Sequence, residues 1–213
     1  HIPMLPVTGD ISPSDYCSGF SHDNESAKPG YYQVFLERYN INAELTSTLR
    51  CAYHKYTFRP GDDKKLVADM TRSNNHVREW NIEQKDKYVF TGFQHAEGKL
   101  YFYAVSNYPL KNIEQIKNDK HEVSLVHFDN SKGREPLELK IGFSFVSTEN
   151  AKMNLEKEMI TKSFDQVYEE ADRTWETLLS KIQVEGGTQR QKGIFYSCLY
   201  RAFLWPALRS DVN

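Results

Sequence analysis

The sequence lacks a surplus of either charge. Its 213 residues include 27 basic and 29 acidic side chains, which leaves a formal net charge of −2. Proteins that bind nucleic acid mainly through charge carry a basic surplus, so the composition argues against that class. No apolar run approaches the roughly 20 residues that a membrane-spanning helix needs. No signal peptide is present, and because the first residue is His1 and not methionine, we expect the natural N-terminus to lie upstream.

Cysteine is scarce and no metal-binding motif is present. The three cysteines, Cys17, Cys51 and Cys198, are odd in number and far apart, which argues against a disulfide framework or a zinc knuckle. We therefore expect them to be buried free thiols. The seven histidines are scattered singly, without the HxxxH or HExxH spacing of a zinc site. A nucleophile elbow, a P-loop and a dinucleotide-binding fingerprint are absent as well.

The middle of the chain carries the pattern of a β-sheet. Residues 1–30, dense in proline and glycine, are predicted to be irregular. From Tyr31 to Val146, apolar and polar residues alternate with the period of two that indicates strands. The predicted strands are 31–36, one long strand over 41–54, 65–70, 77–82, 88–94, 100–106, 122–128 and 137–146. Strands at this spacing predict an antiparallel sandwich or barrel.

At Ser147 the periodicity becomes helical. Ala151, Leu155 and Met159 recur at the spacing of one helix face, and Ser147 or Thr148 can cap this first helix. A run of strands followed by a run of helices predicts two units and not one interleaved fold.

Capping boxes, in which Gln follows Ser or Thr by three residues, mark two further helix starts. Ser163 opens one box and Thr188 opens the other. We expect Gly186-Gly187 to end the second helical segment and Pro206 to interrupt the third. The third helix carries a wide apolar stripe, made of Ile194, Phe195, Cys198, Leu199, Ala202 and Phe203. Little of the sequence follows that could cover this stripe, so we expect its partner beyond Asn213 or on another chain.

The stretch Ser21–Leu36 joins a cluster of polar residues to a strand. Ser, Asn and Asp side chains bond nearby backbone groups, and Pro29-Gly30 marks a turn, so the pattern indicates a capped surface loop that leads into a core strand. Polar loops at the mouth of a strand are also places where binding residues are found. The candidates for such a role are His22, Asp23, Asn24 and Glu25.

Two other patterns allow a structural and a functional interpretation. Aromatic residues make up 13% of the chain; they can stack on sugar rings, although we favour a place in the sandwich core. Glu44, Arg50 and His54 would share one face of the predicted long strand, either as a solvated or interdomain face or as a ligand-facing surface. Catalysis by two carboxylates needs a defined separation between them, which spacing along the sequence does not give.

Several long segments resemble the N-terminal domain of glycoside hydrolase family 92. They are HIPMLPVTGD, FSHDNESAKPGYYQVFL and INAELTSTLRCAYHKYTF. The segments that resemble the continuation of the same family are IGFSFVSTENAKMNLEKE, FDQVYEEADRTWETLLSKIQVEGG and FYSCLYRAFLWPALRSDVN. The matches follow the family's order and run almost from end to end, and only the stretch from about Gly61 to Arg134 is generic.

This resemblance implies a fold and a division of the chain. The implied fold is mainly β, an antiparallel β-supersandwich followed by C-terminal helices that form a linker and the first helix of an (α/α)6 barrel. The sandwich, without its N-terminal part, would cover 1–146, the helical linker 147–187, and the start of the catalytic domain 188–213.

The resemblance also implies an activity, that of exo-acting, inverting, calcium-dependent α-mannosidases. The general acid, the general base and the calcium ligands of such enzymes come from barrel segments that no position here matches, so no catalytic residue and no metal ligand is assigned to this chain. His22, Asp23, Asn24 and Glu25 match a family motif and are carried forward as candidates for substrate binding.

The leading hypothesis is a fragment of a secreted or periplasmic bacterial α-mannosidase that is inactive by itself. Its partners would be the catalytic barrel of the same protein and an α-mannoside glycan. The alternatives are a stand-alone carbohydrate-binding module and a purely structural sandwich.

Overall fold

The protein is a two-sheet sandwich with helices on one outer face. The computed structural model describes residues 2–130, 133–205 and 208–212. Within them, a four-stranded sheet runs in the order β1 (Met4–Val7), β6 (Lys65–Ala68), β11 (Glu122–Phe128) and β10 (Leu110–Lys117). An eight-stranded sheet runs in the order β2 (Glu25–Lys28), β3 (Tyr31–Leu36), β4 (Ile41–Ser47), β5 (Cys51–Thr57), β12 (Leu137–Ser144), β9 (Lys99–Ser106), β8 (Val89–His95) and β7 (Glu79–Asp86). All strand pairs are antiparallel, which confirms the predicted fold class.

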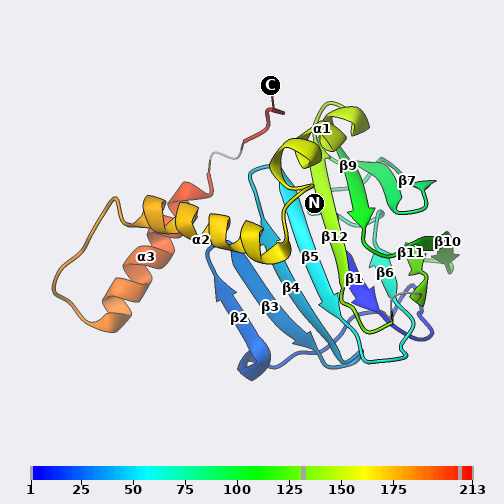
Figure 1. Ribbon diagram of the computed structural model, residues 1–213, viewed down its shortest axis with the longest axis horizontal. Coiled ribbons are helices and arrows are strands. Elements are labelled where there is room, and N and C mark those ends of the chain that lie inside the picture. The colour runs from blue at the N-terminus through cyan, green and yellow to red at the C-terminus, as the bar shows by residue number, and fades with distance from the viewer. Residues whose placement is uncertain (1, 131–132, 206–207, 213) are drawn as a thin grey trace.

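The helices follow the last strand. The short 3-10 helix η1 (His22–Asn24) precedes β2, and the C-terminal helices are α1 (Thr148–Glu158), α2 (Phe164–Leu179) and α3 (Gln189–Phe203). Figure 1 shows α1 and α2 lying across the larger sheet, whereas α3 projects away from the sandwich. Among the described residues, no helix combines the length and the apolar character needed to cross a membrane.

The main core lies between the two sheets. The side chains that are almost completely shielded from solvent there include Tyr56, Phe90, Phe102, Tyr108 and Leu66. Removal of a large apolar side chain from water stabilises a fold by about 1.5–3 kcal/mol. Burial of these rings confirms that much of the aromatic content belongs to the sandwich core.

The predicted strand over 41–54 is wrong, because this segment is a hairpin. A turn over 48–50 separates β4 from β5, and the backbone N–H of Thr48 donates to the carbonyl oxygen of Cys51 over 2.9 Å. The turn contains neither glycine nor proline, so the local sequence does not predict a turn at this place. Its Thr48 hydroxyl (2.5 Å) and its Arg50 backbone N–H (3.1 Å) donate to the carboxylate of Glu158, so a tertiary contact from the end of α1 holds it.

The hairpin also separates residues that were expected on one face. Glu44 pairs with Lys55 on the outer face, while His54 pairs with Leu45, whose side chain packs against the main core. Arg50 lies in the turn itself. The predicted common face of Glu44, Arg50 and His54 therefore does not exist.

The N-terminal segment is more regular than predicted. Residues 4–7 and 25–28 form β1 and β2, each at the edge of its sheet, and β10 was likewise not predicted. Pro6 is tolerated in β1 because an edge strand leaves some backbone N–H groups unpaired. Such short edge strands are specified by the strand they pair with and only weakly by their own residues.

The helix starts were predicted correctly. Ser147 caps α1, and both capping boxes form, with Ser163 at the start of α2 and Thr188 at the start of α3. The second helix ends at Leu179, before the Gly186-Gly187 pair that was expected to end it. The third ends at Phe203; Pro206, expected to interrupt it, lies outside the described residues.

A second, smaller core joins the outer face of the larger sheet to α1 and α2. It contains Cys51, Tyr53, Leu155, Met159, Phe164 and Val167. Gly142 of β12 allows the backbone of α1 to approach, since a Cβ there would lie 2.1 Å from the carbonyl oxygen of Ala151. Gly30 does the same for α2, and its φ of +81° also favours glycine.

Only one of the three cysteines fits the expectation of a buried thiol. Cys51 is buried in the second core, whereas Cys17 and Cys198 are exposed. All three are free, which agrees with their spacing. Burial in the second core raises the pKa of the Cys51 thiol to about 12.

Candidate functional site

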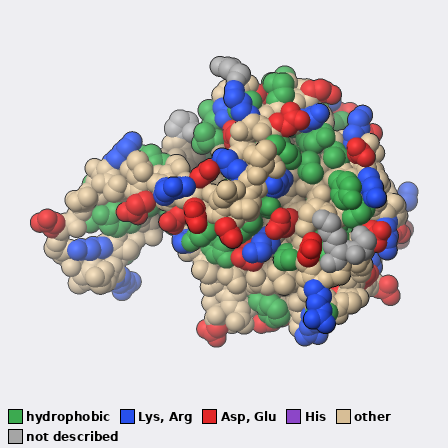
Figure 2. Space-filling model, viewed as in Figure 1, with side chains coloured by type: hydrophobic (Ala, Val, Ile, Leu, Met, Phe, Trp, Pro, Cys, Tyr) green, Lys and Arg blue, Asp and Glu red, His purple; other side chains and the backbone are tan. Residues whose placement is uncertain are grey.

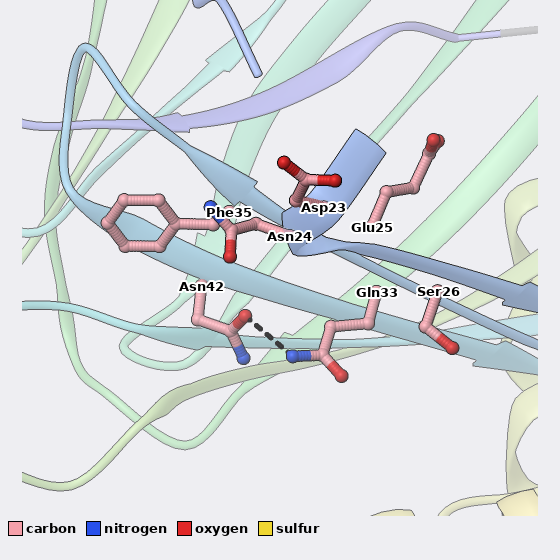
Figure 3. A pocket seen from close by; sticks show the side chains of 7 residues that line it. All are labelled: Asp23, Asn24, Glu25, Ser26, Gln33, Phe35 and Asn42. Carbon is pink, nitrogen blue, oxygen red and sulfur yellow. Dashed lines mark hydrogen bonds between the residues drawn. The ribbon is translucent and has the colours of Figure 1, made fainter. Parts of the chain in front are cut away.

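A polar hollow of about 530 Å³ opens where η1 leads into β2. Its lining residues are Asp23, Asn24, Glu25, Ser26, Gln33, Phe35 and Asn42 (Figure 3). Three of the four predicted binding residues, Asp23, Asn24 and Glu25, thus come together. His22 is not among the residues that line the hollow.

The loop at the rim is a capped turn, as its residues suggested. Ser21 is the N-cap of η1, and its hydroxyl accepts a hydrogen bond from the backbone N–H of Asp23 over 3.2 Å. The backbone N–H of Asn24 donates to the Ser21 carbonyl oxygen over 3.0 Å. This single turn places Asp23 and Asn24 above the first residues of β2, where the hollow begins.

His22 and Glu25 are paired with each other, although the side chain of His22 is 87% exposed. Nδ1 of His22 lies 2.5 Å from Oε2 of Glu25, while the Tyr32 hydroxyl donates to Oε1 of Glu25 over 2.7 Å. The hydrogen bond from Tyr32, followed by that of His22, lowers the pKa of Glu25. Burial and the Glu25 carboxylate raise the pKa of Tyr32 to about 12. This triad ties the rim of the hollow to β3.

The opposite wall is a polar ladder on the outer face of the larger sheet. Nε2 of Gln33 donates to Oδ1 of Asn42 over 3.0 Å (Figure 3). The Tyr31 hydroxyl donates to Gln33 Oε1 (3.0 Å) and to Glu44 Oε1 (3.1 Å). Lys55 Nζ lies 3.3 Å from Oε2 of Glu44 and neutralises the end of the ladder.

Sequence reasoning missed the residues of this wall. Gln33 and Asn42 are adjacent only because the register of β3 against β4 pairs Gln33 with Glu44 and Phe35 with Asn42. Their signal is the alternation of polar residues in two neighbouring strands, which places them together only once the register of β3 against β4 is known.

The hollow is suited to hydrogen bonding with hydroxyl groups. It presents carboxylate and amide oxygens, amide N–H groups and the half-buried ring of Phe35, which can pack on an apolar face of a ligand. In Figure 3 the carboxylates of Asp23 and Glu25 point to the side opposite Gln33 and Asn42, so these acids do not flank a common point on that wall. Within the part of the chain that the structure describes, no group of three or more His, Cys, Asp or Glu residues could hold a metal ion.

The fold and the hollow define a class: a two-sheet antiparallel sandwich with a helical extension and a polar surface site. A model of the glycosyl hydrolase family 92 N-terminal domain matches residues 1–156, and a model of the family's catalytic domain matches residues 150–213. The chain belongs to glycosyl hydrolase family 92. The two matches overlap within α1.

Solved structures of this family share the fold over nearly the whole chain. A family GH92 α-mannosidase of Bacteroides thetaiotaomicron superposes with a TM-score of 0.86 at 26% identity, over 99% of this chain and 33% of its own. Its complex with mannoimidazole gives a TM-score of 0.85 at 26% identity, over 99% and 32%. A family GH92 inverting mannosidase of the same species, at 24% identity and a TM-score of 0.83, covers 96% and 30% and supports the fold alone. The chain thus spans about a third of the length of these proteins, and no curated protein matches its sequence.

Proposed function

We propose that this chain is the sandwich and connecting region of an exo-acting, inverting α-mannosidase that removes terminal α-mannose from glycans. The observation that carries this proposal is the pair of family matches, which together span the chain from the N-terminal domain into the catalytic domain. The likeness to a family GH92 α-mannosidase bound to mannoimidazole supports a mannoside as the substrate class.

The reaction would use carboxylates that lie outside this chain. Inverting glycosidases hold a general acid and a general base about 6.5–9.5 Å apart, so that a water molecule fits between the base and the sugar. Asp23 and Glu25, the carboxylates of the hollow, point away from its Gln33 and Asn42 wall, and the described residues hold no group of three or more His, Cys, Asp or Glu suited to a metal. Calcium, which the family resemblance implies, therefore does not fit the residues described here, and its ligands would lie elsewhere in the whole protein.

The part played by this chain would be support and recognition. The second core packs α1 and α2 on the sandwich, and these helices would hold the catalytic part at a defined place. The polar hollow, with Asp23, Asn24 and Glu25, would contact hydroxyl groups of the glycan, while His22 would act through Glu25.

Hydrolysis assays with the full-length protein and with residues 1–213 test this proposal. The full-length protein should release nitrophenol from 4-nitrophenyl α-mannoside and mannose from α-mannobiose, with inversion visible by NMR of the first product. Chelation of calcium should abolish this turnover. Residues 1–213 alone should give none. Turnover by residues 1–213, or a full-length protein that hydrolyses no α-mannoside, would contradict the proposal.

A role for the hollow is tested by alanine at Glu25 in the full-length protein. The expected result is a KM raised about tenfold, because one charged hydrogen-bond acceptor for a sugar hydroxyl is lost. Ala27 of the same strand, replaced by serine, serves as the control because it does not line the hollow. A lower melting temperature with unchanged kinetics would show that Glu25 only ties the turn.

A stand-alone carbohydrate-binding module is the second candidate, favoured by the openness of the hollow to solvent and by its half-buried Phe35. Calorimetric titration of residues 1–213 with mannose and with mannobiose separates the two functions. Submillimolar binding would favour the module. A secreted or periplasmic location is proposed with the enzyme and is checked by cell fractionation.

A further inference from the structure

After α3 the chain returns to the sandwich and inserts one carboxylate among neutral donors. Oδ2 of Asp211 accepts hydrogen bonds from the Ser144 hydroxyl over 2.9 Å and from Nδ2 of Asn150 over 2.8 Å. Oδ1 of Asp211 accepts one from Nδ2 of Asn154 over 2.7 Å. The donors come from the end of β12 and from α1, so the carboxylate joins both elements to a segment about 60 residues later.

Asn154 is a buried polar residue whose partners include this segment. It is fully shielded from solvent, and its Nδ2 also donates to the carbonyl oxygen of Phe143 over 2.7 Å. Its Oδ1 accepts from the backbone N–H of Val212 over 2.9 Å. A buried amide without partners costs free energy. Asparagine therefore suits this position, because Asp211 accepts a hydrogen bond from its Nδ2 and the Val212 backbone donates one to its Oδ1.

Arg50 closes the arrangement from the β4–β5 turn. Its Nε donates to the carbonyl oxygen of Ser210 over 2.6 Å, and its Nη1 lies 2.7 Å from Oε1 of Glu158. We call this arrangement the clasp: Ser210–Val212 held by Arg50, Ser144, Asn150 and Asn154. It is unlike the rest of the C-terminal region, since no residue of α3 is buried.

We propose that the clasp fixes where the catalytic part of the protein sits on the sandwich, and that Asp211 is a positioning residue for the glycosidase reaction. The proposal rests on the proposed function, because residues 150–213 match the family's catalytic domain. The clasp fixes Ser210–Val212 of that match against β12, α1 and the β4–β5 turn. A displacement of about 1 Å far from the chemistry can lower a rate by up to about a hundredfold.

The test is Asp211→Asn in the full-length protein, with Asp119→Asn as the matched control. The Asp211→Asn change keeps the shape of the side chain but replaces one oxygen by an NH2 group, which then opposes either the donor of Asn154 or the donors of Ser144 and Asn150. Asp119 is an exposed residue of the β10–β11 turn and touches no part of the clasp. Amide hydrogen exchange at Val212 reports the clasp directly, and kcat on 4-nitrophenyl α-mannoside reports positioning.

Asp211→Asn should speed exchange at Val212 at least about tenfold and lower kcat about tenfold, with KM changed less. Asp119→Asn should change neither. If the Val212 amide of the Asp211→Asn variant exchanges at the wild-type rate, the clasp is contradicted. Faster exchange with unchanged kcat would show that the clasp is only structural and overturn the positioning role. If the wild-type protein hydrolyses no α-mannoside, the proposed function fails, and the exchange comparison still decides whether the clasp forms.

Discussion

The sandwich and α3 contain similar apolar side chains, but the sandwich buries them whereas α3 leaves them exposed to solvent. Phe90 and Phe102 are completely buried between the sheets, whereas Phe203 is 38% exposed and Trp205 71% exposed after the end of α3. Figure 2 shows hydrophobic side chains, in green, on the surface of the projecting arm at the left of the view. The ring contact of Trp175 in α2 with Tyr200 in α3, at 4.6 Å between centroids, is one of the few that join α3 to its neighbour.

This difference shows that a hydrophobic stripe in a sequence predicts a helix or strand. It does not predict which surface will cover that stripe. The sandwich satisfies its apolar faces with its own strands, since residues of both sheets meet in one core. The stripe on α3 is not covered by any described residue to the point of burial. Exposed apolar surface of this kind marks an interaction site. Under the proposed function, the site receives the rest of the catalytic domain.

The largest expected effect comes from matched truncations in the two regions. In residues 1–213, Phe102→Ala should lower the free energy of unfolding by about 3–5 kcal/mol, because it leaves a cavity in the main core. Phe203→Ala should change it by less than about 0.5 kcal/mol, as expected at an exposed position. Denaturation in urea measures both values. Equal losses would mean that α3 is already packed in this chain and would break the comparison.

A smaller effect is expected where the helices meet the sandwich. Gly142→Ala should lower the free energy of unfolding by about 1–3 kcal/mol, because its Cβ would lie 2.1 Å from the backbone oxygen of Ala151 and would push α1 away. Gly98→Ala is the control, since nothing lies within 4 Å of its Cβ position. Thermal melting of both variants is the measurement. A Gly142 variant as stable as the control would show that α1 does not rest on β12.

The smallest effect concerns pH and the N-terminal edge of the sandwich. Although partial burial opposes it, hydrogen bonds from Lys65, Thr8 and Gly9 lower the pKa of Asp63 to about 2. A carboxyl group whose pKa is lower in the folded state stabilises the fold above its unfolded pKa. That contribution is lost as pH falls from about 4 to 2. Because the side chain is 48% exposed, we expect less than about 1 kcal/mol.

The measurement is urea denaturation of the wild type and of Asp63→Asn between pH 2 and pH 7. The stability difference between the two proteins should be constant above pH 5 and should shrink towards pH 2. A difference that does not depend on pH would mean that the carboxylate of Asp63 makes no net contribution.

Features that depend on residues close together in the sequence were predicted, and features that depend on residues far apart were missed. Helix starts at Ser163 and Thr188 were correct because a capping box is a contact between residues three apart. The β4–β5 turn was missed because Glu158, more than 100 residues away, stabilises it. The same reason explains β1, β2 and β10, which depend on their partner strands.

The candidate site shows the same division. Asp23, Asn24 and Glu25 were found as a local polar cluster, and they line the hollow. Gln33 and Asn42 were missed because only the strand register brings them together. The clasp of Asp211 was missed because its donors lie on β12 and α1, far along the sequence. Local chemistry could be predicted, whereas contacts between distant elements could not.

Amide hydrogen exchange tests the central claim, that the described strands bury their apolar faces against one another, whereas the apolar stripe of α3 is covered only in the longer protein of the proposed function. We predict that the amides of β5, β9 and β12 are equally protected in residues 1–213 and in the full-length protein. Those of α3 should be protected at least about a hundredfold more in the full-length protein, because its apolar stripe is then covered. Equal protection of α3 in both proteins would contradict the claim.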